Sequence, residues 1–161
     1  MDARAHELIA TLGLQSHPEG GHYREIYRAA APVSRPADGA LRAALTVIHF
    51  LLLRGASSRW HQVQADEVWQ YIEGAPLQLC EFPAGGGGGR RSTLGPLAPG
   101  QAPVHVVPAG HWQAAQTLGD YTLLACTVAP GFDFADFRLL AEQPEGAVAA
   151  PENLPFWRAL L

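Results

Sequence analysis

Three side chains of this sequence, His61, Glu67 and Tyr71, have the types and the spacing that suit acid–base chemistry. An imidazole titrates near neutral pH, and a carboxylate within hydrogen-bonding distance orients the ring and raises its pKa. Asp66 or Glu67 is the candidate carboxylate, and Tyr71 follows a few residues later. The cluster predicts a site that moves protons on a bound small molecule, with His61, Glu67 and Tyr71 as catalytic groups.

Other polar and aromatic side chains are candidates for binding that molecule. Gly20 and Gly21 precede a predicted strand, and such a pair indicates a backbone conformation that other residues avoid. The backbone does not require the neighbouring Glu19 and Arg24, so these two residues are candidates for binding a ligand. Tryptophans near the cluster most often pack in a core, but their faces also suit a sugar ring. We expect the ligand to be bound by Glu19, Arg24, His49, Trp69 and Gln113.

Length and composition predict one globular domain, residues 1–161. The chain has 161 residues, of which 48% are hydrophobic and 16% charged, so a disordered chain is excluded. Its net charge of −4 has the wrong sign for a dedicated nucleic-acid binder. The longest apolar run, residues 43–53, is shorter than the ~18 residues that a membrane span needs. We expect a cytoplasmic protein with two buried core thiols, Cys80 and Cys126, that binds neither nucleic acid nor membranes.

Short apolar segments separated by glycine and proline predict an antiparallel all-β fold. A short helix is expected over residues 3–12, with Asp2 as its N-cap and Gly13 at its end. Residues 32–40 are expected to form a loop, and the tail from residue 133 to 161 to form one or two short helices. The expected strands are residues 43–53, 58–64, 67–73, 76–82, 91–94, 103–107, 111–117 and 121–128.

Two short motifs resemble those of the cupin superfamily. The first cupin motif has a glycine, two histidines one residue apart, a glutamate and a closing glycine, and the chain has Gly55, His61, Glu67 and Gly74 in register. A closer resemblance, to the cupin-5 family (domain of unknown function 985), extends over nearly the whole chain. The matching segments are residues 17–21, 60–61, 66–69, 107–110 and 128–134.

This resemblance implies a double-stranded β-helix, the cupin jelly roll, with a short N-terminal helix and short C-terminal helices. Members of the family are small, commonly dimeric proteins whose biochemical role is not established. A homodimer is therefore expected, and the strand around Ile26 and Tyr27 and the phenylalanine-rich residues 132–137 are the candidate interfaces.

The chain departs from the superfamily pattern at its metal-ligand positions. His61 and Glu67 stand at two of them, but Val63 replaces the second histidine and Gln113 the histidine of the second motif. Valine cannot ligate, and catalytic metal sites generally use three good protein ligands. We therefore expect no cofactor. The alternative is a divalent zinc, nickel, iron or manganese ion held by His61, Glu67 and Gln113.

Three functions remain open from the sequence. The favoured one is a metal-independent isomerase or epimerase that acts on a carbohydrate-like or nucleotide-sugar substrate, by analogy with metal-free sugar-nucleotide epimerases among cupins. The second is a metal-dependent cupin, either a dioxygenase or an isomerase. The third is a non-catalytic ligand-binding or sensor protein.

Overall fold

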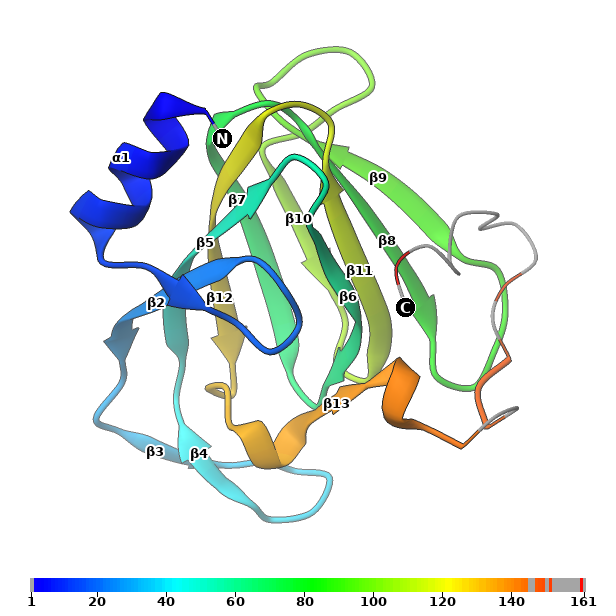
Figure 1. Cartoon of the computed structure of the whole chain (residues 1–161). Helices are drawn as coiled ribbons and strands as arrows, with labels where there is room; N and C mark the ends of the chain where they lie inside the picture. The colour runs from blue at the N-terminus through cyan, green and yellow to red at the C-terminus, as the bar shows by residue number, and fades with distance from the viewer. Residues whose placement is uncertain (1, 145–146, 150, 152–159, 161) are drawn as a thin grey trace.

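The computed structural model describes residues 2–144, 147–149, 151 and 160, and it consists largely of two facing antiparallel sheets (Figure 1). The six-stranded sheet contains, in spatial order, β1 (Gln15–Ser16), β2 (His22–Arg28), β5 (Thr46–Leu53), β12 (Tyr121–Ala129), β7 (Asp66–Gly74) and β10 (Val104–Val107). The five-stranded sheet contains β13 (Phe137–Leu139), β6 (Ser57–Val63), β11 (His111–Thr117), β8 (Leu77–Pro83) and β9 (Arg90–Leu94). The predicted jelly roll is confirmed.

The N-terminal helix α1 (Ala3–Leu12) forms as its capping residues predict. The Asp2 carboxylate accepts hydrogen bonds from the amides of Arg4 and Ala5, and Gly13 ends the helix with a φ of 61°. Leu8 packs against Leu51 and Leu123 on the outer face of the six-stranded sheet. The helix therefore covers that face and leaves the space between the sheets to other residues.

Alternation along β5 assigns its side chains to the two faces of the sheet. Phe50 and Leu52 belong to the core between the sheets, whereas Leu51 packs under α1. Trp69 and Leu79 complete this inner core from opposite sheets. Both cysteines are buried free thiols, as predicted. The inner core fills one part of the barrel, and a cavity occupies another.

Two segments differ from the sequence-based expectation. Residues 32–40 were expected to form a loop, but β3 (Pro32–Ser34) and β4 (Leu41–Ala43) pair as a two-stranded sheet. The tail contains the 3-10 helices η1 (Phe134–Asp136) and η2 (Leu140–Glu142) with β13 between them. Strand β13 forms because β6 offers it an edge, and that partner is distant in sequence. The remaining tail residues 145–146, 150, 152–159 and 161 lie outside the described part.

Apolar side chains stay exposed where the sequence predicts a dimer interface. Ile26 and Tyr27 are 48% and 55% exposed on β2, and Phe134 is 54% exposed. The homodimer stays a prediction. Within the described residues, no helix is long and apolar enough to cross a membrane.

Candidate active site

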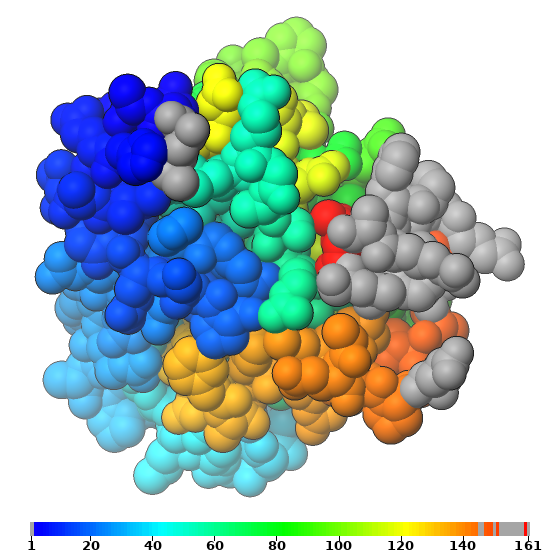
Figure 2. All heavy atoms as spheres, in the orientation of Figure 1, coloured from blue at the N-terminus to red at the C-terminus, as the bar shows by residue number. Residues whose placement is uncertain are grey.

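A cavity of about 480 Å³ opens between the sheets and is bounded by β2, β5, β6, β7, β12 and the residues that follow β12. In Figure 2 the blue surface around residue 20 adjoins the yellow-orange surface around residues 130–136. The ionisable lining side chains include two histidines and two glutamates, namely His17, Glu19, His61 and Glu67. The apolar lining is Tyr23, Ile48, Phe50, Val63, Val128, Phe132 and Phe134. The cavity therefore combines proton-transfer groups with an aromatic wall.

Glu19 reaches the cavity because its loop is fastened to β6. The Glu19 carbonyl accepts a hydrogen bond of 2.8 Å from the Arg59 amide, and the Arg59 guanidinium donates to the Pro18 carbonyl. Gly20 has a φ of 109°, and a Cβ there would lie 2.1 Å from the Ser57 carbonyl oxygen. Only glycine fits this close approach, so the expectation of an unusual backbone at the glycine pair is confirmed.

His61 lies on β6 with one ring nitrogen engaged and the other available. Its Nδ1 donates a hydrogen bond of 2.8 Å to the Arg59 carbonyl, which leaves Nε2 as the unprotonated nitrogen of the neutral ring. That Nε2 lies 3.4 Å from Glu19 Oε2. Burial lowers the pKa of His61, although the nearby Glu67 opposes the shift. His61 is therefore a neutral base at neutral pH.

Two buried carboxyls of the cavity, Glu19 and Glu67, have pKa values far above the ordinary range. Burial raises the pKa of Glu19 to about 8, despite a hydrogen bond from Ser58, and raises that of Glu67 to about 7, despite the nearby His61. Burial likewise lowers the pKa of His17 to about 4. The site thus holds carboxyl groups able to donate a proton beside the His61 imidazole, which is able to accept one at the same pH.

Gln113, on β11, holds the Glu67 side chain in place from outside the cavity. Its side-chain NH₂ donates to Glu67 Oε2, and its carbonyl oxygen accepts a hydrogen bond of 2.9 Å from the Trp69 indole. Both Gln113 and Trp69 are 1% exposed. These two predicted ligand-binding residues are therefore packed behind Glu67 and do not line the cavity.

Other candidate residues lie away from the cavity. The Tyr71 hydroxyl donates to the Gly74 carbonyl, and Trp69 intervenes between Tyr71 and Glu67 on the same side of β7. Arg24 donates to the Leu12 carbonyl at the end of α1. His49 alternates with Ile48 and Phe50 on β5, so it points away from the cavity that these two residues line. The structure brings together His61, Glu67 and Glu19.

Sequence reasoning missed several cavity residues. His17 belongs to a segment that was interpreted as partly structural, yet its Nδ1 lies 3.5 Å from Glu19 Oε2. The Cys126 thiol lines the cavity and forms a hydrogen bond with Glu67. Phe132 and Phe134 were expected to pack in the core or at an interface. The clustering of phenylalanines in the sequence marks this segment as notable. Its place in the cavity wall could not be predicted, because the other lining residues are distant in sequence.

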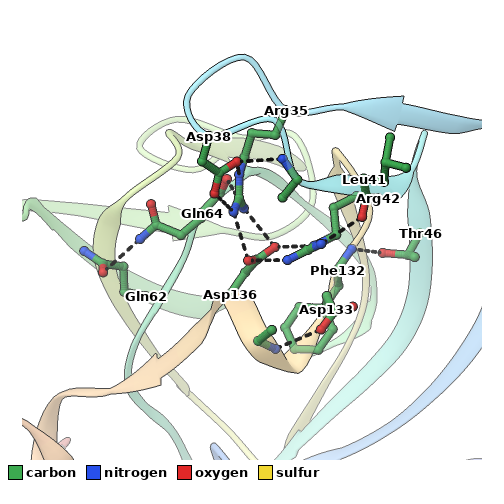
Figure 3. Close-up of polar contacts among 12 residues, drawn as sticks. Arg35, Asp38, Leu41, Arg42, Thr46, Gln62, Gln64, Phe132, Asp133 and Asp136 are labelled. Atoms are coloured by element: carbon green, nitrogen blue, oxygen red, sulfur yellow. Dashed lines mark hydrogen bonds and ion pairs between the residues drawn. The ribbon is translucent and has the colours of Figure 1, made fainter.

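Buried ion pairs hold the segment that carries those phenylalanines (Figure 3). Asp136, at the end of η1, accepts hydrogen bonds from Arg35 and Arg42 of the β3–β4 hairpin. The Phe132 amide donates to Thr46 Oγ1 on β5. These contacts join the aromatic wall to the hairpin, so the hairpin that the sequence did not predict supports the cavity.

Replacing Asp136 with asparagine is expected to lower the free energy of unfolding by about 2 kcal/mol, because two arginines then lose a buried anion. The matched control is Asp38→Asn, which removes a half-exposed carboxylate from the same Arg35 and should have a smaller effect. Urea unfolding at pH 7 measures both variants. Equal losses in the two variants would contradict the structural role of Asp136.

The donor set does not fit a metal ion. Among the described residues, no group of three or more His, Cys, Asp or Glu is arranged to hold one. The Gln113 carbonyl oxygen, the remaining candidate donor, already accepts the Trp69 indole, and Val63 lines the cavity where a second histidine would be needed. The residues present supply acid–base groups instead of a coordination shell.

A double-stranded β-helix with an imidazole and carboxyl groups inside the barrel is the architecture of a cupin. The chain belongs to the family Cupin_5, described as "Cupin superfamily (DUF985)", whose family model matches residues 6–140. None of the curated proteins matches the chain.

Solved structures agree with this assignment. A hypothetical protein from Leishmania major is 31% identical with a TM-score of 0.78, over 92% of this chain and 99% of that one. A protein from Shewanella oneidensis is 32% identical with a TM-score of 0.75, over 94% of this chain and 99% of that one. Oxalate decarboxylase from Lactobacillus farciminis is 18% identical with a TM-score of 0.58, over 81% of this chain and 36% of that one, and this likeness concerns the fold alone.

Proposed function

We propose that this cupin is an isomerase or epimerase that binds a small carbohydrate-like molecule and transfers a proton by general acid–base catalysis, without a metal ion. One observation carries the proposal: the unprotonated Nε2 of His61 lies 3.4 Å from the Glu19 carboxyl, with Glu67 in the same cavity. The raised pKa values of about 8 and about 7 keep Glu19 mostly protonated and Glu67 partly protonated near neutral pH, so either can act as an acid.

In the proposed reaction, His61 Nε2 takes a proton from a carbon next to a carbonyl group of the substrate. Glu19 or Glu67 donates its proton to the carbonyl oxygen, so that an enediol forms with His61 protonated and one carboxylate charged. Return of the proton from His61 to the neighbouring carbon yields an isomer, while the charged carboxylate takes back a proton from an enediol hydroxyl. For an epimer, the second carboxyl protonates the opposite face of the first carbon, the first carboxylate takes back the enediol proton, and the His61 imidazolium passes its proton to the second carboxylate. Each cycle restores the neutral imidazole and the protonated carboxyl.

Two other functions remain as alternatives. A non-catalytic binding protein would use the same cavity without proton transfer. A metal-dependent dioxygenase or isomerase would need further good ligands beside His61 and Glu67. Gln113 is engaged with Trp69, and among the described residues no three His, Cys, Asp or Glu side chains are arranged to hold one ion, which argues against it. The proposal is favoured because it uses only groups that line the cavity.

Incubation of the protein with unlabelled aldoses and ketoses in D₂O is expected to incorporate deuterium at the carbon beside the carbonyl. The proton that His61 takes from the substrate can exchange with D₂O while the imidazole holds it, so a deuteron is returned to the carbon. Proton NMR measures the loss of the corresponding signal over time. Binding of a sugar without any exchange would leave a binding protein as the function and overturn the proposed catalysis.

A chelator-treated sample is the control for the metal-dependent alternative. Exchange should continue at the same rate after dialysis against chelator, with metal content followed by plasma mass spectrometry. Loss of exchange that returns on addition of zinc, nickel, iron or manganese would replace this proposal with the metal-dependent one.

A further inference from the structure

The charges of the cavity lining restrict the substrate that it can accept. Among the described residues, Arg28 is the one lining side chain that carries a permanent positive charge. Two negatively charged side chains, Glu25 and Asp133, line the same cavity. The recognition of a phosphate group ordinarily requires arginine or lysine side chains, or backbone amides at a helix N-terminus.

Arg28 is already neutralised within the cavity wall. Its Nε and Nη2 donate to the two carboxylate oxygens of Glu25 at 2.9 and 2.7 Å, and Nη1 and Nη2 donate to the Phe132 carbonyl at 3.2 Å. This forked pairing uses the donors that would otherwise bind a phosphate. The histidines do not replace it, because burial holds the pKa of His17 and of His61 below the ordinary value.

The remaining lining matches an uncharged polyhydroxylated molecule. Phe132, Phe134 and Tyr23 offer aromatic surface to the apolar C–H faces of a sugar ring. Glu19, His61 and Thr46 offer hydrogen-bonding atoms to its hydroxyl groups. The volume of about 480 Å³ lies within the ~300–1,000 Å³ of small-molecule pockets.

We infer that the cavity selects an unphosphorylated sugar and rejects the phosphate ester or nucleotide-linked form of the same molecule. This inference rests on the proposed function and decides between the two substrate classes that the sequence left open. Among the described lining residues, Arg28 is already paired with Glu25, so an anionic group at the rim would face Glu25 and Asp133 with no unpaired cation to compensate for the repulsion.

The test compares matched ligands on the wild-type protein by titration calorimetry. Glucose, galactose and mannose are each compared with their 6-phosphates and with their nucleoside-diphosphate forms. We expect at least one of the neutral sugars to bind, and its charged derivatives to bind at least ~10-fold more weakly, a ratio that corresponds to about 1.4 kcal/mol. Tighter binding of a charged derivative, or binding of none of the neutral sugars, would overturn the inference.

The variant Glu25→Gln tests whether the Glu25–Arg28 ion pair prevents the binding of phosphate. The variant frees the Arg28 guanidinium, so the affinity for the 6-phosphate of the binding sugar should rise at least ~10-fold over wild type. The double variant Glu25→Gln with Arg28→Gln is the matched control and should lose this gain. Equal phosphate affinity in wild type and Glu25→Gln would show that the ion pair does not govern selection.

The two proposals fail in different ways. A neutral sugar that binds but shows no deuterium exchange overturns the catalysis and leaves the substrate class standing. A phosphorylated sugar that binds tightly and exchanges deuterium overturns the substrate class and leaves the catalysis standing. Binding and exchange are therefore measured on the same ligands.

Discussion

Replacing His61 with asparagine is expected to reduce deuterium exchange on a bound sugar by about 10²–10⁴-fold, the usual contribution of a general base. Asparagine can keep the hydrogen bond from the Nδ1 position to the Arg59 carbonyl, but it removes the Nε2 lone pair. His17 cannot take over, because its Nδ1 already accepts a hydrogen bond from the Glu19 amide. The measurement is the initial exchange rate at saturating sugar, with affinity determined separately by calorimetry.

Tyr71→Phe is the matched control for this loss. The Tyr71 hydroxyl donates to the Gly74 carbonyl outside the cavity, so its removal should change the exchange rate by less than about 3-fold. The comparison also tests the catalytic role that the sequence assigns to Tyr71. Exchange that survives His61→Asn, or that falls equally in Tyr71→Phe, would contradict the assignment of His61 as the base.

Glu19→Gln is expected to stabilise the protein at alkaline pH by about 2–4 kcal/mol, because a buried carboxyl no longer resists ionisation. Burial raises the pKa of Glu19 in the folded state from 4.5 to about 8. As the pH rises between these values, the unfolded chain releases this proton and the folded chain keeps it, so wild-type stability falls. Below pH 4.5 both states are protonated, and the variant should match wild type.

Urea unfolding at pH 4.5 and pH 9 measures this difference. The glutamine retains an oxygen that can accept the Ser58 hydroxyl, so the packing of the site is preserved. A Glu19→Gln protein that is less stable than wild type at pH 9 would mean that the fold stabilises the Glu19 carboxylate, so that its folded-state pKa is not raised and Glu19 does not serve as an acid.

Glu81→Gln is the control with the opposite sign. Glu81 is 4% exposed, and burial by itself would raise its pKa, but His105 and His111 outweigh burial and hold the pKa below its ordinary value. The stabilisation by such a carboxylate is present at neutral pH and is lost as the pH falls through its folded-state pKa. Glu81→Gln should therefore be less stable than wild type at pH 7, whereas Glu19→Gln should not.

Local sequence patterns determined most of the secondary structure. The helix follows from Asp2 and Gly13, whose capping contacts span only a few residues. The strands from β5 to β12 lie close to their predicted bounds, because alternation and glycine turns act between near neighbours. Strand β13 was missed because its partner β6 is distant in sequence. The β3–β4 hairpin was missed although its strands are near neighbours, because proline, alanine and glycine in residues 32–40 indicate a loop.

The sequence also indicated two of the ionisable side chains that line the cavity, His61 and Glu67, since they follow one another closely along the chain. The sequence could not show that Glu67 lines the cavity and Tyr71 does not, because both side chains lie on the same side of β7. In the structure, the buried Trp69 lies between them and closes the cavity on that side. Likewise, the strand register turns His49 outward, although its type and position made it a reasonable ligand candidate.

Tertiary structure alone decided the chemistry of the site. Glu19 reaches the cavity because its loop docks on β6 through the Arg59 amide, across a separation of forty residues, and the acid role that we propose for it depends on that contact. The pKa values of Glu19, Glu67 and His61 depend on how many distant segments exclude water from them. Hydrophobic alternation and turn residues are properties of neighbouring positions and can be read along a chain, whereas burial is a property of the assembled barrel and cannot.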